Sequence, residues 1–136
     1  MNSTVTSMDR SASFLRLALV ADAVISGATG LMMTFGADLA TGLLGLPAPL
    51  LRFAGLSLLP FAAVVAFIGL REKISRPAVW GVIVYNALWV ADSILLLASG
   101  LIAPTALGYA FTLAQALAVA ILADAQFVGL RKLNAA

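Results

Sequence analysis

Three aspartates, Asp22, Asp92 and Asp124, lie within long apolar stretches of this 136-residue sequence. Ionisable side chains are costly in such surroundings, so by default they mark sites of binding or proton exchange. Two arginines, Arg16 and Arg52, are the cations nearest to these stretches. Because two arginines face three carboxyls, at least one carboxyl lacks a cation, and we expect it to be Asp22. Two interpretations of Asp22 stay open: a structural carboxyl held by hydrogen bonds, or one that exchanges a proton or binds a ligand.

The arginines are predicted to form structural ion pairs. Arg16 and Asp124 lie at similar shallow depths in their segments, which predicts a pair between them. Arg52 has two alternatives, because it is within reach of both Asp92 and Asp38.

Further polar and aromatic side chains share helical faces with the aspartates, since residues three or four apart lie on one face. They are predicted to converge inside a bundle. One interpretation is interhelical hydrogen bonding, worth about 0.6 kcal/mol per contact, and the other is a polar-lined cavity with an aromatic wall. Thr112 and Gln126 belong to this set of polar side chains. The candidate binding or proton-exchange residues are Asp22, Ser26, Tyr85, Asn86, Trp89, Asp92 and Gln115.

Other kinds of site are not indicated. The sequence has no Cys and no His, which removes thiolate and imidazole metal ligands, Cys nucleophiles and His-based triads. It shows no nucleotide-binding glycine loop, nucleophile elbow or basic stripe for nucleic acid. We therefore expect no metal, no cofactor, no nucleic-acid partner and no enzymatic activity.

The elements that carry these residues are predicted to be membrane-spanning helices. Hydrophobic residues make up 62% of the sequence and charged residues 10%, against about 25% charged in soluble domains. Segments of about 20 apolar residues span a bilayer as helices. The sequence predicts an all-α bundle of four spans over residues 14–35, 50–70, 78–101 and 105–130 of a membrane domain at 14–131, with a polar, loosely ordered tail at 1–13 and a second tail at 132–136.

Basic residues predict the orientation of the spans. Seven of the eight flank the first span, the connection between spans two and three, or the end of span four; Arg52 is the exception. Because basic loops stay in the cytoplasm, we expect both termini inside, in a cell inner (plasma) membrane. The long outer loop at 36–49 contains a predicted short amphipathic helix, Ala37 to Leu46, which either lies flat on the membrane or covers an outward cavity.

The chain also contains a predicted internal repeat. Val20-Ala21-Asp22 matches Val90-Ala91-Asp92 at a shift of seventy residues, and residues 67–71 match 127–131 at a shift of sixty. These matches favour a duplicated helical hairpin, with Asp22 and Asp92 at equivalent places. Both hairpins would enter the membrane from the same side, as in a parallel repeat.

Four short spans, the outer loop after span one and the cytoplasmic ends resemble the DoxX-like group of small bacterial membrane proteins. The Asn-x-x-Trp element at Asn86 to Trp89 is similar to one in other small four-span bacterial proteins. The stretch from Ala21 to Phe35 also resembles the small multidrug resistance transporters, which carry Glu where this chain has Asp22 and often have a weaker charge bias. These resemblances imply a bacterial membrane protein and carry over no site residue.

Two functions follow as hypotheses. The first is a non-enzymatic membrane protein that binds a small apolar or lipid-like ligand or serves as an accessory subunit of a membrane complex. The second is a proton-coupled transporter of small solutes that uses Asp22 and Asp92. Either function is compatible with a homo-oligomer or a larger membrane assembly.

Overall fold

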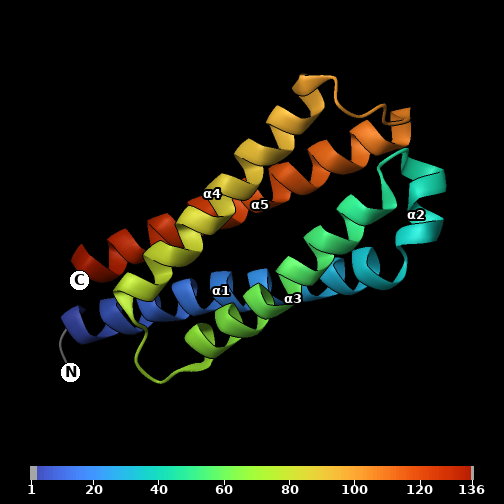
Figure 1. The fold of residues 1–136 in the computed structure, drawn as a ribbon. Helices are drawn as coiled ribbons and strands as arrows, with labels where there is room; N and C mark the ends of the chain where they lie inside the picture. The colour runs from blue at the N-terminus through green and yellow to red at the C-terminus, as the bar shows by residue number, and fades with distance from the viewer. Residues whose placement is uncertain (1–2, 136) are drawn as a thin grey trace.

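The computed structural model describes residues 3–135, and helices account for most of that range (Figure 1). The described residues contain no strand. In chain order the helices are α1 (Ser3–Phe35), α2 (Ala37–Leu44), α3 (Ala48–Leu70), α4 (Arg76–Ser99) and α5 (Ala106–Ala135). The prediction of an all-α fold with four long helices and one short helix in the first long connection is confirmed.

The four long helices are apolar and long enough to cross a bilayer. The candidate spans are Ala12–Phe35, Ala48–Leu70, Arg76–Ser99 and Ala106–Asn134. At a rise of about 1.5 Å per residue, each exceeds the roughly 30 Å of hydrocarbon that a span must cover. Their outward faces carry large exposed apolar side chains such as Leu17, Phe67 and Leu117. The protein is therefore a multi-pass membrane protein built as a four-helix bundle.

The first and last helices extend beyond the predicted spans. The polar segment that we expected to be loosely ordered is helical from Ser3 onward, and α5 continues to Ala135. Residues 3–13 and 131–135 contain neither glycine nor proline, so nothing in these segments breaks a helix that begins or ends in the apolar span. Met1, Asn2 and Ala136 lie outside the described residues.

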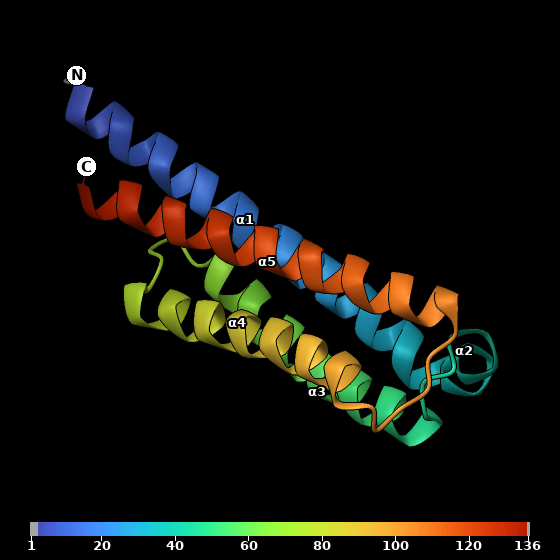
Figure 2. The same cartoon turned by 90° about the horizontal axis from the view of Figure 1, so that it is seen from above.

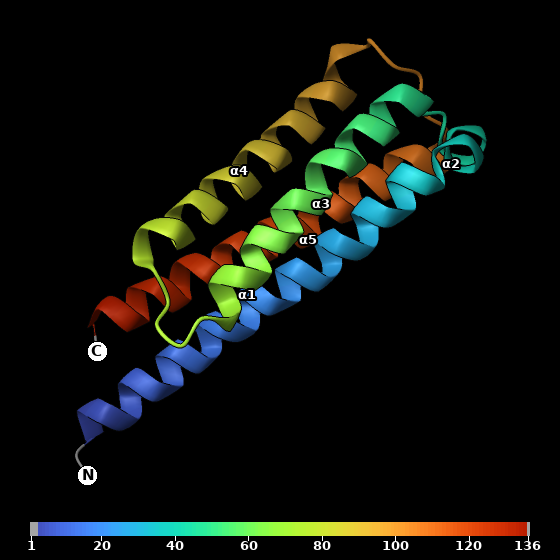
Figure 3. The same ribbon diagram turned by 60° about the horizontal axis from the view of Figure 1, so that its bottom comes forward.

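The long helices pack in an order that differs from their order along the chain. α1 packs against α3 on one side and α5 on the other, and α5 packs against α4 (Figures 2 and 3). α3 and α4 follow one another in sequence, yet they make the weakest contact of the bundle. The tight crossing of α1 and α3 requires small residues, because a Cβ added to Gly55 would lie 2.8 Å from the carbonyl oxygen of Gly30. The bundle is thus compact on the α1 side and looser between α3 and α4.

The short helix α2 lies across one end of the bundle and is held there by the start of α5 (Figure 2). Thr105 donates its backbone N–H to Leu44 O at 3.0 Å and its hydroxyl to Leu43 O at 2.8 Å. Both acceptors are carbonyls of the last turn of α2, which have no partner within the helix. Gly45 ends α2 in the left-handed region, at φ 70°. α5 can approach because Gly108 has no side chain, since a Cβ there would lie 1.9 Å from Leu44 O.

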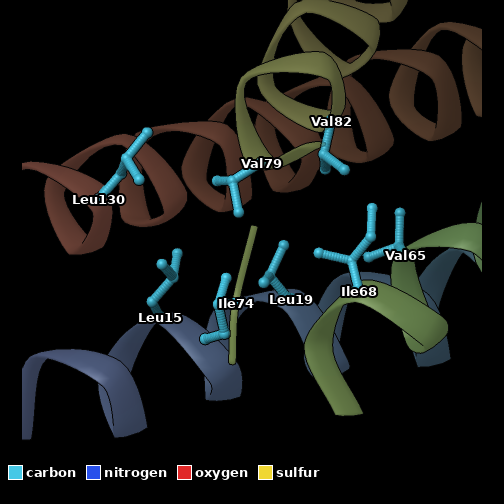
Figure 4. Packing of buried hydrophobic residues seen from close by; sticks show 8 residues of the cluster. All are labelled: Leu15, Leu19, Val65, Ile68, Ile74, Val79, Val82 and Leu130. Carbon is cyan, nitrogen blue, oxygen red and sulfur yellow. The ribbon is translucent and has the colours of Figure 1, made fainter. Parts of the chain in front are cut away.

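The opposite end of the bundle, which we name the basic end, holds the start of α1, the α3–α4 connection and the end of α5. An apolar core fills it with side chains from all four long helices and from Ile74 in the connection (Figure 4). Each side chain is at most 8% exposed. The members are Leu15, Leu19, Val65, Ile68, Ile74, Val79, Val82 and Leu130. This core packs the four long helices against one another at the basic end.

Arg16 secures the α3–α4 connection at the same end. Its guanidinium donates to Gly69 O and Arg71 O, both at 2.6 Å, and to Glu72 O at 3.3 Å. α3 ends without a glycine cap, because Arg71 is extended, so its last carbonyls need an outside donor. A cation also suits the negative end of the helix dipole. Arg16 therefore acts as a cap on α3, supplied by α1.

Candidate functional site

Asp22 lies at the centre of a closed hydrogen-bond network next to the apolar core. Its side chain is fully buried. One carboxyl oxygen accepts the Ser26 hydroxyl at 2.9 Å, and the other accepts amide N–H groups of Asn86 and Gln126, both at 2.8 Å. Asn86 also donates to Gln126 Oε1 at 3.1 Å. We call Asp22, Ser26, Asn86 and Gln126 the Asp22 network.

The Asp22 network joins three helices at one point, because its residues come from α1, α4 and α5. All four side chains are at most 6% exposed. Buried polar groups of this kind are costly only when partners are missing, and here both Asp22 oxygens have donors. The network and the adjacent apolar core make up what we call the closed half of the bundle.

The other half, towards α2, contains a cavity of about 390 Å³. We call this part the open half. Its lining side chains come from all four long helices and from Leu46, which follows α2. The lining comprises Met33, Leu46, Leu50, Leu51, Phe53, Ala54, Ser57, Tyr85, Leu88, Trp89, Asp92, Ser93, Leu96, Phe111, Thr112 and Gln115. A volume of this size lies within the usual range for small-molecule sites, about 300–1,000 Å³.

The cavity has a floor that separates it from the Asp22 network. Tyr85 is the lining residue of α4 nearest the basic end, and it directly precedes Asn86 of the network. Its ring stacks on Phe61 of α3, with centroids 3.8 Å apart and planes 14° apart. Its hydroxyl lies 3.0 Å from Ser57 Oγ. These contacts join α3 to α4 below the cavity, so the two polar regions are distinct.

The two facing walls of the cavity differ in polarity. The α3 wall is apolar above Ser57, with Leu50, Leu51, Phe53 and Ala54. The opposite wall carries a strip of polar groups on α4 and α5, described next. The cavity is thus amphipathic, with apolar surface facing a line of hydrogen-bonding groups.

Gln115 organises the polar wall. Its Oε1 accepts the indole N–H of Trp89 at 2.5 Å, and its Nε2 donates to Ser93 Oγ at 3.0 Å and to Thr112 O at 2.9 Å. Ser93 donates in turn to Trp89 O at 2.8 Å. The ring of Trp89 is therefore fixed in orientation, and it presents a rigid aromatic surface to the cavity.

Two oxygen-bearing side chains of this wall have no partner among the described residues. The Thr112 hydroxyl has no hydrogen bond, although the residue is only 6% exposed. Asp92 lines the cavity at an exposed position, and within the described side chains its carboxylate neither pairs with a cation nor accepts a hydrogen bond. The Asp92 carboxylate is positioned to receive a donor from a molecule in the cavity, whereas protein atoms cover the Thr112 hydroxyl oxygen.

The exposed part of the cavity lining lies on α3 and α4. Its most exposed large apolar side chains are Phe53, at 77%, and Leu88, at 59%. They belong to the pair of neighbouring helices with the weakest contact. These side chains place the mouth of the cavity between two candidate membrane spans.

The structure revises the predicted ion pairs. Arg16 contacts carbonyl oxygens of α3 and its connection, and it does not reach Asp124, which is exposed on α5. The prediction was wrong because it weighed depth alone, whereas α3 ends beside α1 and offers nearer acceptors. Arg52 pairs with Asp38 at 2.6 Å, which selects the second of its two alternatives. Both partners of this pair are largely exposed, at 46% and 87%.

The candidate residues from the sequence separate into two groups. Asp22, Ser26 and Asn86 lie in the Asp22 network, and Tyr85, Trp89, Asp92 and Gln115 line the cavity. Helical spacing alone could not separate them, because Asn86 and Tyr85 are adjacent on α4 yet point to different places. The apolar wall, including Phe53 and Ala54, was missed, and no sequence signal distinguishes its side chains from lipid-facing ones.

Comparison of the chain with protein-family models, curated proteins and solved structures found no match. The resemblance to DoxX-like proteins therefore stays an expectation. The cavity and the Asp22 network are the features of this chain that bear on its function.

Proposed function

We propose that the protein is a non-enzymatic membrane receptor for a small lipid-like molecule, which enters from the bilayer between α3 and α4. The observation that carries this proposal is the amphipathic cavity of about 390 Å³, whose exposed apolar lining belongs to two candidate membrane spans. Ligand sites are usually apolar cavities with a few convergent polar groups that fix orientation. The polar wall around Gln115 supplies those groups.

Two features support binding over passage through the bundle. The floor at Tyr85 and the apolar core at the basic end stand between the cavity and that end. Asp22, one of the two carboxyls that the transporter hypothesis requires, has donors on both oxygens and does not line the cavity. Transport would require both barriers to open, whereas binding requires neither to move.

The experiment is a quenching titration in maltoside micelles with a bromine-bearing long-chain alcohol as the probe. The chain has two tryptophans, so a Trp80→Phe variant reports on Trp89 in the cavity alone. We expect saturable quenching of Trp89. The matched Trp89→Phe variant reports on Trp80, which is 46% exposed outside the cavity, and should show unsaturable quenching.

A second pair of variants tests the location of the site. Ala54→Phe should fill the cavity and abolish saturation, whereas Ala63→Phe, on the exposed face of the same helix, should leave it unchanged. Quenching that rises linearly at Trp89 and resists Ala54→Phe would show that no binding site exists.

We also propose that the basic end faces the cytoplasm of a cell whose plasma membrane holds the protein. The basic residues of the α3–α4 connection and of the end of α5 support this orientation. Because the chain has no cysteine, Glu72→Cys and Ala103→Cys variants can each carry a single thiol. An impermeant maleimide added to intact cells should label Ala103→Cys only. Labelling of Glu72→Cys alone would reverse the orientation.

A further inference from the structure

We propose that the cavity selects amphiphiles that carry a protonated amine or quaternary ammonium group, and that Asp92 binds this cation. The inference deepens the proposed function, because it names the chemical class of the ligand. It rests on the juxtaposition, in one cavity, of an apolar wall and a carboxylate that has no partner among the described side chains.

Asp92 is placed for this role by its depth and by its lack of partners. It lies seven residues before Ser99, the last residue of α4, which is about 10 Å from that end of the helix. At the end of the bundle where α2 lies, Arg52 is the only basic residue of the spans. It is bound to Asp38. A carboxylate at this depth is costly without a cation. A cationic ligand supplies the missing charge.

The apolar wall of the cavity fits the remainder of such a ligand. Leu50, Leu51, Phe53 and Ala54 of α3 face the polar wall on which Asp92 lies. An alkyl chain therefore packs against α3 while its cationic head contacts Asp92 of α4. Thr112 lines the same cavity, but protein atoms cover its hydroxyl oxygen, so it is not a ligand contact.

The other exposed aspartate of the spans provides a matched control. Asp124 lies on α5 outside the cavity lining, closer to the basic end. Substituting asparagine for either aspartate removes one carboxylate from a membrane helix. Only the substitution at Asp92 removes it from the cavity.

The test is competition against the brominated alcohol in the Trp80→Phe background, at neutral pH in maltoside micelles. The competitors are dodecylamine, which is protonated at this pH, and the neutral dodecanol. We expect dodecylamine to bind more tightly than dodecanol. Asp92→Asn should weaken dodecylamine about tenfold, the effect of losing one charged contact, and leave dodecanol unchanged. Asp124→Asn should change neither.

One further variant keeps the result interpretable. Asp92→Glu retains the charge and should restore most of the preference for the amine. Equal affinity of the two competitors for the native protein, or an Asp92→Asn variant with native preference, overturns the inference while the cavity remains a binding site. Absence of saturable binding by any probe overturns the proposed function itself.

A cationic ligand could come from two sources, a membrane aminolipid or a free cationic amphiphile. Short-chain phosphatidylethanolamine and phosphatidylglycerol, each added as a competitor to the micelles, distinguish the two sources. Competition by the ethanolamine lipid alone identifies the lipid as the ligand, and competition by neither lipid identifies a free amphiphile. Competition by the glycerol lipid, which carries no cation, contradicts selection by Asp92.

Discussion

The closed half and the open half of the bundle each contain one aspartate of the predicted repeat, and the two carboxyls have opposite surroundings. Asp22 has three donors and no exposure. Asp92 is exposed at the cavity and has no partner among the described side chains. A buried polar group with all partners present contributes stability, whereas one without partners is available for a ligand. In this protein the neighbours of an intramembrane carboxyl, more than its position in the predicted repeat, set what it can do.

The largest expected effect is loss of stability when Asp22 is removed. Asp22→Ala leaves Ser26 and Gln126 Nε2 without an acceptor and Asn86 with Gln126 Oε1 alone. It should lower the free energy of unfolding by about 2 kcal/mol, from two interhelical contacts at about 0.6 kcal/mol each plus a cavity. Thermal unfolding in detergent, followed by circular dichroism, measures this. Asp92→Ala is the matched control and should cause no loss, because Asp92 has no partner among the described side chains. Equal losses for the two variants would remove the contrast between the halves.

Arg16 tests the closed half at its end. Arg16→Ala removes three charge-assisted hydrogen bonds to the end of α3 and should cost about 1.5 kcal/mol in the same unfolding experiment. Arg16→Lys keeps the charge without the fork of donors and should recover part of the loss. A fully stable alanine variant would show that the α3–α4 connection needs no cap from α1.

Trp89 tests the open half. Trp89→Phe removes the hydrogen bond to Gln115 but keeps an aromatic ring, so the stability loss should be about 0.6 kcal/mol. Binding should suffer more than stability, because the replacement ring lacks the hydrogen bond to Gln115 that fixes the aromatic surface against the cavity. Isothermal calorimetry with dodecylamine and thermal unfolding report the two effects separately. A loss of stability as large as that of Asp22→Ala would mean that polar contacts stabilise the open half as much as the closed half.

The smallest effect is expected at the exposed ion pair between α2 and α3. Arg52→Gln breaks the contact with Asp38, and exposed pairs contribute about 0–1 kcal/mol. We expect a change below about 0.5 kcal/mol that vanishes at high salt. A larger effect that persists in salt would show that this pair, in addition to Thr105, holds α2 in place.

The sequence predicts the helices well, because a bilayer imposes length and hydropathy that any span must meet. It also indicates the residues that face inward, since Asn86 and Trp89 cannot favour lipid. It cannot divide them between the Asp22 network and the cavity, because that depends on the packing order of helices distant in sequence. The Arg16 contacts were missed for a second reason, because their acceptors are backbone carbonyls, which carry no residue-type signal. The duplicated hairpin itself stays a prediction.

The Asp22 network has a consequence for how the chain is made. Asp22 enters the membrane with the first helix, but its donor Gln126 lies 104 residues later, on the last. During synthesis the carboxyl must wait for α4 and then α5 before its donors are complete. The first hairpin therefore contains a buried carboxyl without its interhelical donors, and a chain truncated before α5 should be retained by the insertion machinery or degraded. Asp22 thus stabilises the assembled bundle and destabilises the partly assembled one.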